Sequence, residues 1–305
     1  MKTSITTLTL SPAYDVHVNI DDFKLYRENI AESVSRDIGG KGINISRALH
    51  ENGIDCDTVI ILGRDNSAEF IRGMESENLK YTLLECDGRI RENITVHPSD
   101  GNETRLSFKG FHCDASVLKE IESLLPSNGI ITFTGSLPDG ISQADAEAFL
   151  MRLKNNGTKL VIDSKSVTLD MLRRIKPWLI KPNAEEIEAY FGTEMSEAEL
   201  YCKALELHSD GIGNVMISLG GDGALLASGG ALYRARVPKI DVVSTIGAGD
   251  SSIAGFIASS GTSEDRLRNA VSYGSAACLR DGTNPPLEKN IAEISKNVLI
   301  EKIVL

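Results

Sequence analysis

Short and almost wholly apolar runs recur along the chain, and each of them ends in polar or glycine residues. Continuous apolar strands that alternate with helices are typical of a parallel sheet whose two faces are both covered. The pattern therefore predicts an α/β fold with a mostly parallel central sheet, in which ligands bind at the carboxyl ends of the strands. The expected strands lie at 58–63, 129–135, 158–164, 178–183 and 214–221, and stretches with helical spacing follow at 67–78 and 142–157.

Two segments follow a different pattern, in which apolar and polar residues alternate. They are residues 14–23 and 93–108, and the second contains a His-Pro-Ser-Asp-Gly-Asn stretch with turn chemistry. Alternation is typical of a sheet with one exposed face. We expect a small second sheet, contributed by about residues 12–37 and 90–111, that stands off the main domain. Ordinary edge hairpins and a lid or dimer surface explain this pattern equally well.

Residues 244–251 read Ser-Thr-Ile-Gly-Ala-Gly-Asp-Ser, and their first three residues end a largely apolar run at 240–246. We expect that run to be a strand and a helix to begin near Asp250. The backbone amides of the Gly-Ala-Gly stretch, with the helix N-terminus, would then converge on one point and hold an anionic oxygen. Asp250 itself has two interpretations, a helix N-cap or a base that takes a proton from an attacking hydroxyl. The stretch lacks the third glycine of a dinucleotide-binding loop.

A second glycine-rich stretch, residues 37–53, opens another expected helix. Lys41 and Asn44 lie at the start of this helix, among Gly39, Gly40 and Gly42. A cation beside free amides suits a phosphate or a polyol. A close backbone crossing beside a solvated lysine explains the same residues equally well.

A strand is expected to end at Lys181, directly before Asn183 and Glu186. Asn and Glu three residues apart have the spacing of a capping box, which is their structural role. Their oxygen atoms would also lie at the carboxyl end of a strand, where they suit Mg²⁺ through water. The glycine-rich stretch 217–226 predicts a tight turn between two strands, and near a nucleotide it would wrap phosphates or adenine.

Composition narrows the class of protein. The chain has 305 residues and a formal net charge of -11, which argues against a nucleic-acid-binding or anionic-membrane surface. Its five cysteines are scattered and form no CxxC pair, so we expect unpaired thiols in a reducing cytoplasm rather than disulfides or a zinc site. No apolar run has the length of a signal peptide or a membrane span, and we expect a cytoplasmic protein.

Five stretches taken together, in this order, resemble the ribokinase-like (PfkB) family of sugar kinases over essentially the whole chain. They are GGKGINISRAL, TGSLPDG, LIKPN..E, ISLGGDGAL and STIGAGDSSIAGF. Within the family, SPAYD, SFKGF and the Ile-Asp-Ser that ends the expected strand at 158–164 are most similar to the phosphosugar branch. The resemblance implies a single kinase domain spanning 1–305, a large α/β part with a small β-sheet lid, and a lid sheet that often pairs between subunits as a homodimer.

The resemblance also implies roles for individual residues. Asp250 would be the general base, with the Gly247, Ala248 and Gly249 amides around the transferring phosphoryl group. The sugar and its own phosphate would be held by Asp15, Gly39, Gly40, Lys41, Asn44, Arg91 and Ser136, with Lys41 and Arg91 on the phosphate. ATP would be bound by Lys181, Asn183, Ser218, Gly220, Gly221, Gly223 and Gly249, and Mg²⁺ by Glu186 and Asn183 through water.

The activity that the resemblance implies is ATP- and Mg²⁺-dependent phosphorylation of a sugar phosphate, with fructose 1-phosphate as the leading substrate. Lys41 favours a 1-phosphate, because the family's 6-phosphofructokinase more often has glycine at that position. Tagatose 6-phosphate and fructose 6-phosphate remain alternative substrates. A protein of another class, a sensor that binds sugar phosphate or nucleotide without catalysis, is also compatible with the sequence, although the intact Asp250 and its glycines count against it.

Overall fold

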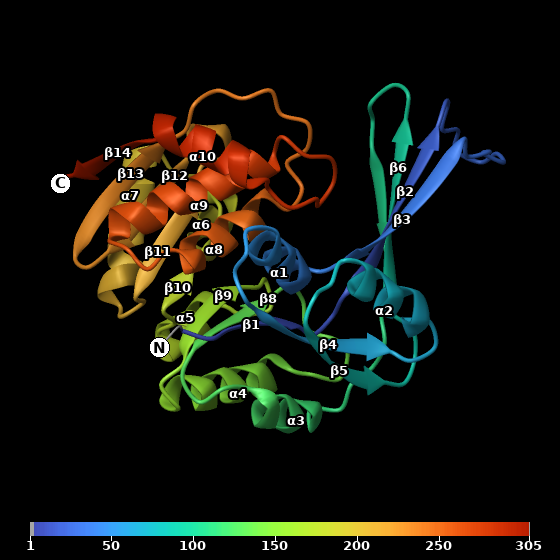
Figure 1. Cartoon of the computed structure of the whole chain (residues 1–305), viewed down its shortest axis with the longest axis horizontal. Helices are drawn as coiled ribbons and strands as arrows, with labels where there is room; N and C mark the ends of the chain where they lie inside the picture. Colours follow the sequence, from blue (N-terminus) through green and yellow to red (C-terminus); the bar gives the residue numbers. More distant parts are fainter. Residues whose placement is uncertain (1–2, 305) are drawn as a thin grey trace.

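The computed structural model describes residues 3–304, and its centre is a ten-stranded sheet (Figure 1). Across the sheet, the strands from β5 to β11 are parallel, and β12, β13 and β14 continue it antiparallel. The expected α/β fold with a mostly parallel sheet is confirmed. In sheet order the strands are β5 (Tyr81–Cys86), β4 (Asp57–Gly63), β1 (Ile5–Thr9), β8 (Ile130–Thr134), β9 (Lys159–Asp163), β10 (Leu179–Ile180), β11 (Asn214–Ser218), β12 (Ala224–Ser228), β13 (Ala231–Arg236) and β14 (Leu299–Ile303).

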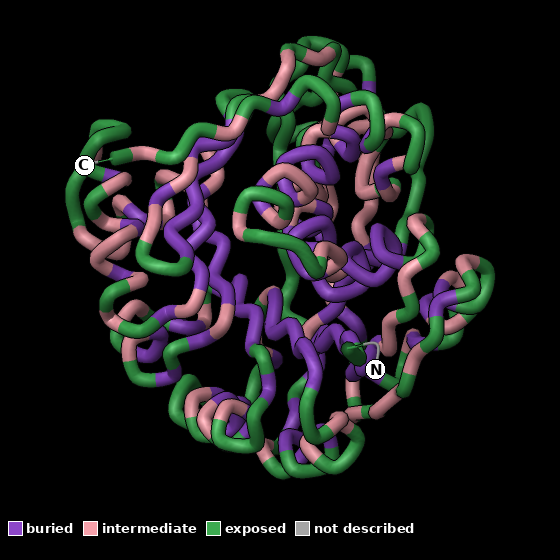
Figure 2. The backbone as a smooth tube through the Cα atoms, turned by 60° about the vertical axis from the view of Figure 1, so that its left-hand side comes forward, coloured by how far each residue is buried: buried purple, intermediate pink, exposed green. Residues whose placement is uncertain are grey.

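Helices cover both faces of this sheet, because nearly every parallel strand is apolar on both sides. Figure 2 shows the central strands as the most continuously buried part of the backbone. One face carries α1 (Lys41–Glu51), α2 (Ser67–Ser76), α8 (Ala248–Ala258), α9 (Ser263–Ala277) and α10 (Glu288–Asn297). The other face carries α3 (Val117–Leu124), α4 (Gln143–Asn155), α5 (Leu169–Ile175), α6 (Ala184–Phe191) and α7 (Glu197–Ser209).

A second, four-stranded sheet projects from the body of the molecule (Figure 1). It is formed in the order β3 (Ser33–Gly39), β2 (Ala13–Ile20), β6 (Arg91–Pro98) and β7 (Thr104–Ser107). The alternating pattern at 14–23 and 93–108 thus does correspond to a small sheet. Successive side chains of each strand point to opposite faces of the sheet, so Asp15 and Asn93 share one face while Val18 and Val34 share the other. We call this sheet the lid.

The strand expected at 240–246 is absent, so that expectation is wrong. The segment is a loop whose Val242 and Val243 side chains are more than half exposed. Its backbone is held by α9 instead of a sheet, since the Val243 amide donates to the Cys278 carbonyl at 2.8 Å. The helix predicted near Asp250 is present and begins at Ala248. The tight turn expected within 217–226 is also confirmed, as a single 3-10 turn (Gly220–Asp222) between β11 and β12.

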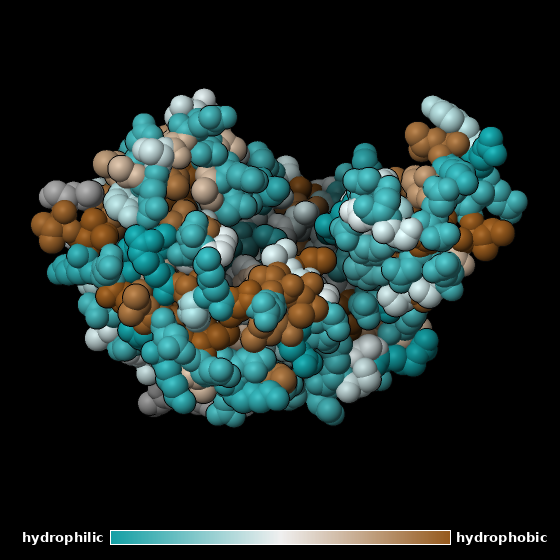
Figure 3. All heavy atoms as spheres, turned by 90° about the horizontal axis from the view of Figure 1, so that it is seen from above, coloured by the Kyte–Doolittle hydropathy of each residue, from teal (hydrophilic) through white to brown (hydrophobic). Residues whose placement is uncertain are grey.

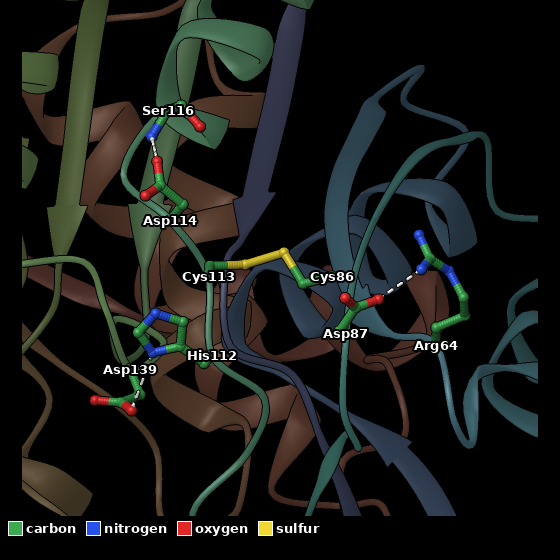
Figure 4. The surroundings of a disulfide bond; sticks show 8 residues. All are labelled: Arg64, Cys86, Asp87, His112, Cys113, Asp114, Ser116 and Asp139. Carbon is green, nitrogen blue, oxygen red and sulfur yellow. Dashed lines mark hydrogen bonds and ion pairs between the residues drawn. A yellow bond between two sulfur atoms is a disulfide. The ribbon is translucent and has the colours of Figure 1, made fainter.

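The cysteine prediction is wrong for one pair, because Cys86 and Cys113 form a disulfide (Figure 4). Cys86 ends β5 just before the chain enters the lid at Arg91, and Cys113 follows the return from β7. The chain leaves and re-enters the body side by side, which brings the two Cα atoms to 5.9 Å despite a separation of 27 residues. Cys56, Cys202 and Cys278 are free thiols among residues 3–304.

The sheet topology fixes where a ligand cleft can form. From β1 the chain continues on one side to β4 and β5 and then crosses back to β8 on the other side of β1. Such a switch point opens a crevice beyond the carboxyl ends of the two diverging strands. Here the lid projects beside that crevice, and Figure 3 shows a hollow between the lid and the body of the molecule.

Candidate active site

A cavity of about 380 Å³ lies at the carboxyl ends of β1 and β8, between the lid and the N-terminal ends of α1 and α8. It is lined by four cationic side chains and three carboxylates, which is an unusual density of charge for one cavity. Two buried threonine hydroxyls in its wall, on Thr9 and Thr134, have no hydrogen-bond partner in the described part of the chain. The cavity brings together ten predicted residues: Asp15, Gly40, Lys41, Asn44, Arg91, Ser136, Lys181, Gly247, Gly249 and Asp250.

Asp250 lies in the first turn of α8 and is only 6% exposed. Burial raises the pKa of its carboxyl to about 6, and the nearby Asp163 carboxylate also raises it. Lys41, Lys181 and a hydrogen bond from the Asn44 amide to Oδ2, at 2.9 Å, oppose that rise. A carboxyl with a pKa of about 6 can exchange a proton near neutral pH. The N-cap of this helix is Gly247, so the capping role considered for Asp250 is not observed.

The glycines before Asp250 leave the start of α8 open to the cavity. Gly247 has a φ of 77°, a conformation in which a side chain would be strained, and it ends the loop without a side-chain cap. The first amides of a helix have no partner inside the helix. The Ala248 amide donates to the Thr245 carbonyl at 3.3 Å, so the amides of Gly247 and Gly249 are the better placed for an anion. Beneath them, the Nζ atom of the buried Lys181 would lie 3.1 Å from a Cβ on Gly249.

Lys41 opens α1 on the opposite wall of the cavity. Its Nζ atom is 2.9 Å from Oδ2 of Asp163, whose side chain is 7% exposed. Burial lowers the pKa of Lys41, but the carboxylates of Asp163 and Asp250 outweigh it, and the pKa is raised overall. Lys41 is therefore a cation near the Asp250 end of the cavity.

The lid supplies the other end of the cavity. Asp15 accepts a hydrogen bond from the Asn93 amide at 2.9 Å and lies 3.9 Å from Nη2 of Arg105. Arg91, at the start of β6, points into the same space. Burial lowers the pKa of Arg91; Asp15 raises it, and the neighbouring Arg105 lowers it. The buried Nε of Arg91 has no hydrogen-bond partner among residues 3–304. Two guanidinium groups that repel each other, one with an unused donor, are suited to bind an anion between them.

Gly39 and Gly40 matter because they have no side chain. A Cβ on Gly39 would lie 2.2 Å from Oδ2 of Asp15, so any side chain there would displace this carboxylate. Gly40 has a φ of 147° and is the N-cap of α1. Both glycines are thus required by the position of Asp15 and by the start of the helix.

A second cavity, of about 370 Å³, lies beyond the carboxyl ends of β9 and β10 and is lined by Asn183 and Glu186. The capping box predicted at the start of α6 is confirmed, since each side chain accepts a hydrogen bond from the other residue's amide. The Asp163 side chain lines this cavity as well as the first, so the two are neighbours. Lys181, the third residue of this motif, lines the first cavity.

The predicted nucleotide loop lies outside both cavities. Ser218 is bridged to Asn183, and its amide donates to the Pro182 carbonyl at 3.0 Å. Gly223 is required by packing, because a Cβ there would lie 2.2 Å from the Ala235 carbonyl oxygen. Gly220 and Gly221 are exposed, and a Cβ on either would meet no atom within 4 Å. The protein itself gives no steric reason for glycine at Gly221.

Among the charged and amide side chains that line the first cavity, sequence reasoning missed three, namely Asp163, Asn93 and Arg105. Asp163 ends β9, and a search for acids at the ends of apolar strands would have found it. Asn93 and Arg105 have no such signal. They reach the cavity only because β7 pairs with β6 and β6 with β2, a register that the alternating pattern does not specify.

Residues 12–290 match the family model described as pfkB family carbohydrate kinase. The chain belongs to this family. It is therefore a phosphotransferase that acts on a sugar hydroxyl, with ATP as the phosphoryl donor that a kinase implies. Among residues 3–304, none of the helices combines the length and apolar content that crossing a bilayer requires.

Curated relatives agree with the phosphosugar branch of this family. The chain is 34% identical over 260 residues to the 1-phosphofructokinase of Haemophilus influenzae, with 83% of each chain covered. It is 33% identical over 285 residues to the 1-phosphofructokinase of Borreliella burgdorferi, with 90% of this chain and 92% of that protein covered. The expected likeness to 1-phosphofructokinase is thus confirmed.

Solved structures agree in fold. A phosphofructokinase of Staphylococcus aureus, described as putative, superposes with a TM-score of 0.82 at 28% identity and covers 98% of this chain and 99% of its own. The phosphofructokinase-2 of Escherichia coli in complex with potassium gives a TM-score of 0.89 at 24% identity, with 97% and 99% covered. The latter identity supports the fold alone.

Proposed function

We propose that the protein transfers the γ-phosphoryl group of ATP to the C6 hydroxyl of fructose 1-phosphate, giving fructose 1,6-bisphosphate and ADP. The observation that carries the proposal is the division of one cavity into two ends. Asp250, a buried carboxyl that titrates near neutral pH, lies at one end, and two lid arginines lie at the other. A substrate with a hydroxyl at one end and a phosphate at the other matches this division, and the 1-phosphofructokinase relatives support it.

In the proposed mechanism the reaction is an in-line displacement. Asp250 accepts the proton of the C6 hydroxyl while that oxygen forms a bond to the γ-phosphorus, and the bond from the γ-phosphorus to the β-γ bridging oxygen breaks. The amides of Gly247 and Gly249, helped by Ala248 where its weak bond to Thr245 yields, stabilise the charge on the transferring group. Asp15, Asn44 and Gly40 hold the sugar hydroxyls so that the attacking oxygen is aligned.

The proposal divides the cations between the two phosphates. The ion pair of Lys41 with Asp163, close to Asp250, supports a role for Lys41 at the transferring phosphoryl group. Arg91 and Arg105 then bind the phosphate that the substrate already carries, with Ser136 in the adjoining wall. The sequence-based expectation paired Lys41 with Arg91 on that phosphate, and the structure favours Arg105 as the partner because it lies on the same sheet.

ATP is proposed to extend from Lys181 and the α8 amides toward Asn183, Ser218 and the turn containing Gly220, Gly221 and Gly223. A ligand that approaches closely would explain the missing side chain at Gly221, where the protein leaves open space. Gly249 belongs to both halves of the site, since Nζ of Lys181 lies so close to it that a Cβ there would be 3.1 Å away.

A magnesium ion fits the oxygen atoms beside α6 only if water and phosphate supply most of its ligands. Residues 3–304 contain no group of three His, Cys, Asp or Glu side chains arranged to hold a metal. Glu186 uses Oε2 in the capping box and keeps Oε1 free, and Asn183 keeps the second lone pair of its oxygen. Mg²⁺ typically binds through one or two carboxylates plus substrate phosphates. When bound, the ion would neutralise phosphate charge.

We further infer that residues 1–305 act as one kinase domain and that two copies pair through their lids. The lid face opposite Asp15 carries Val34 and Leu106, which are 62% and 51% exposed. Figure 3 shows hydrophobic atoms on the projecting part of the molecule. An open sheet with an apolar face is a surface that proteins usually cover.

We also infer a cytoplasmic location, because ATP, the proposed phosphoryl donor, is a cytoplasmic metabolite. The Cys86–Cys113 disulfide is unusual there, since cytoplasmic thiols are kept reduced. Fractionation of cells that express the protein tests the inference. Recovery with periplasmic or secreted markers would refute it.

A coupled assay of ADP release over fructose 1-phosphate, fructose 6-phosphate, tagatose 6-phosphate and free fructose tests the function. The highest kcat/KM is expected for fructose 1-phosphate, and Asp250→Asn serves as the control for contaminating kinases. A higher kcat/KM for tagatose 6-phosphate or fructose 6-phosphate would replace the proposed substrate. Binding of phosphosugars without any ADP release would instead identify a sensor.

A further inference from the structure

A chain of side chains runs from Asp250 away from the cavity and contains a buried arginine that the proposed mechanism does not use. Arg47 belongs to α1, and its side chain is 9% exposed. Its Nε and Nη2 atoms each donate to one oxygen of Glu77, both at 2.6 Å, and Glu77 directly follows α2. This bidentate pair fixes the plane of the guanidinium.

The remaining nitrogen of Arg47 determines how Asn44 is oriented. Its Nη1 atom donates to Oδ1 of Asn44 at 3.2 Å, and Nδ2 of Asn44 donates to Oδ2 of Asp250 at 2.9 Å. An arginine has donors and no acceptor, so the oxygen of the Asn44 amide must face it. The amide NH₂ group is then the end that faces Asp250. Residues 44 and 47 are three apart, which places both side chains on one face of the helix.

We propose that Arg47, held by Glu77, is a positioning residue that sets the amide of Asn44 and through it the orientation of the Asp250 carboxylate. Without the arginine, no donor holds the oxygen of the Asn44 amide, and the amide can rotate so that its NH₂ group no longer points at the carboxylate. With the arginine, one oxygen of Asp250 is occupied by Asn44 and the other is left to face the substrate hydroxyl. This inference rests on the proposed role of Asp250.

The other charged groups around Asp250 do not replace this restraint. Lys41 reaches it from α1, Asp163 from the end of β9 and Lys181 from the residue after β10. Neither lysine makes a hydrogen bond to Asp250, and Lys41 is bonded to Asp163 instead. The one hydrogen bond that the side chain of Asp250 makes within the described residues is the bond from Asn44.

Arg47→Met removes the donor while keeping most of the side-chain volume. It is expected to lower kcat by about 10- to 100-fold, the effect of a small misplacement of a reacting group, with little change in KM for ATP. The acid limb of the kcat–pH profile is expected to move to higher pH, because Asp250 loses the bond that lowers its pKa. Arg47→Lys keeps a donor and is expected to recover part of kcat. Arg174→Met breaks a comparable Arg–Glu pair, with Glu147 on the surface, and should leave kcat unchanged.

A double-mutant cycle separates positioning from a general effect of charge or packing. If Arg47 acts through Asn44, Arg47→Met should cost nothing further in an Asn44→Ala background. Additive losses would overturn the proposal, as would a kcat of Arg47→Met within twofold of the wild type.

Failure of the proposed function is distinguishable from failure of this inference. A wild-type protein that turns over no phosphosugar refutes the function. The orientation of the Asn44 amide is then still measurable in a neutron crystal structure of Arg47→Met, because neutrons distinguish the amide oxygen from the NH₂ group. An amide that has rotated supports the inference, and an amide that still donates to Asp250 overturns it.

Discussion

Asp250 combines burial, a raised pKa and a fixed hydrogen bond from Asn44, and no single one of these properties could be read from the sequence. The glycines before it were predictable, because an open helix start requires residues without side chains. The pKa of the carboxyl also depends on charged groups from three other parts of the chain, Lys41, Asp163 and Lys181. These contacts depend on the sheet order, which local pattern does not specify. The resemblance to the family brought Lys41 and Lys181 into the predicted site, but not Asp163.

The pKa of Asp250 makes the activity pH-dependent. The base works in its ionised form, and burial raises its pKa to about 6. The fraction ionised, and with it kcat, is therefore expected to be full above pH 7 and to fall about tenfold per unit well below pH 6. A pH profile of kcat at saturating substrate concentrations measures this fall of kcat at acid pH. A flat profile between pH 5 and 8 would contradict the assignment of Asp250.

Arg105 is the second prediction at this scale. Removing one charge-assisted hydrogen bond costs about 1.5–3 kcal/mol, so Arg105→Gln should raise KM for fructose 1-phosphate by roughly 10- to 100-fold. KM for ATP should stay within about twofold, because the arginine lies at the lid end of the cavity. Arg64→Gln, in an exposed ion pair with Asp87, is the matched control. Equal increases in both KM values would argue against a site for the substrate's phosphate.

At the scale of elements, predictions were confirmed where a short stretch of sequence is enough to determine the helix end or the strand. The capping box at the start of α6 and the apolar strands β4, β8 and β9 are examples. The run at 240–246 has the composition of a strand but no neighbouring strand to pair with, and it became a loop. The disulfide could not be predicted for a related reason, since the fold of the lid is what brings its two cysteines together.

The disulfide is expected to stabilise the base of the lid. It closes a loop over a sequence separation of 27 residues, for which the chain-entropy model gives about 3.5 kcal/mol. Reduction with dithiothreitol should therefore lower Tm of the wild type. Cys113→Ser should start from the lower Tm and not respond to the reductant, whereas Cys202→Ser, which removes an exposed free thiol, should behave as the wild type does. A wild-type Tm that is insensitive to reduction would contradict this role.

For the whole molecule, the alternating segments predicted a second sheet with two unlike faces, but not which residues each face carries. The face toward the cavity carries Asp15, Asn93 and Arg105, and the opposite face carries Val34 and Leu106. This division agrees with the proposed use of one face by the site and of the other by a second copy of the chain. The alternating pattern alone did not distinguish edge hairpins from a lid or a dimer surface. Because the two faces differ, one sheet can be both a lid and a dimer surface.

The proposed pairing predicts the mass in solution. Light scattering after gel filtration should give about twice the 33.0 kDa of one chain. Val34→Asp puts a charge into the apolar face and should shift the protein to the monomer, whereas Asn102→Asp at the tip of the lid hairpin should not. A wild-type mass of one chain at micromolar concentration would refute pairing through the lid.

The central claim is that this cavity adds a phosphate to C6 of a sugar that already carries one at C1. Phosphorus NMR of a reaction with ATP and fructose 1-phosphate tests it most directly, because it identifies the product rather than the consumption of ATP. The predicted result is a new C6 phosphate signal that grows as ADP forms, at a rate lowered by about 10²- to 10⁴-fold in Asp250→Asn. ADP formation without a C6 phosphate, or an unchanged rate in that variant, would contradict the account.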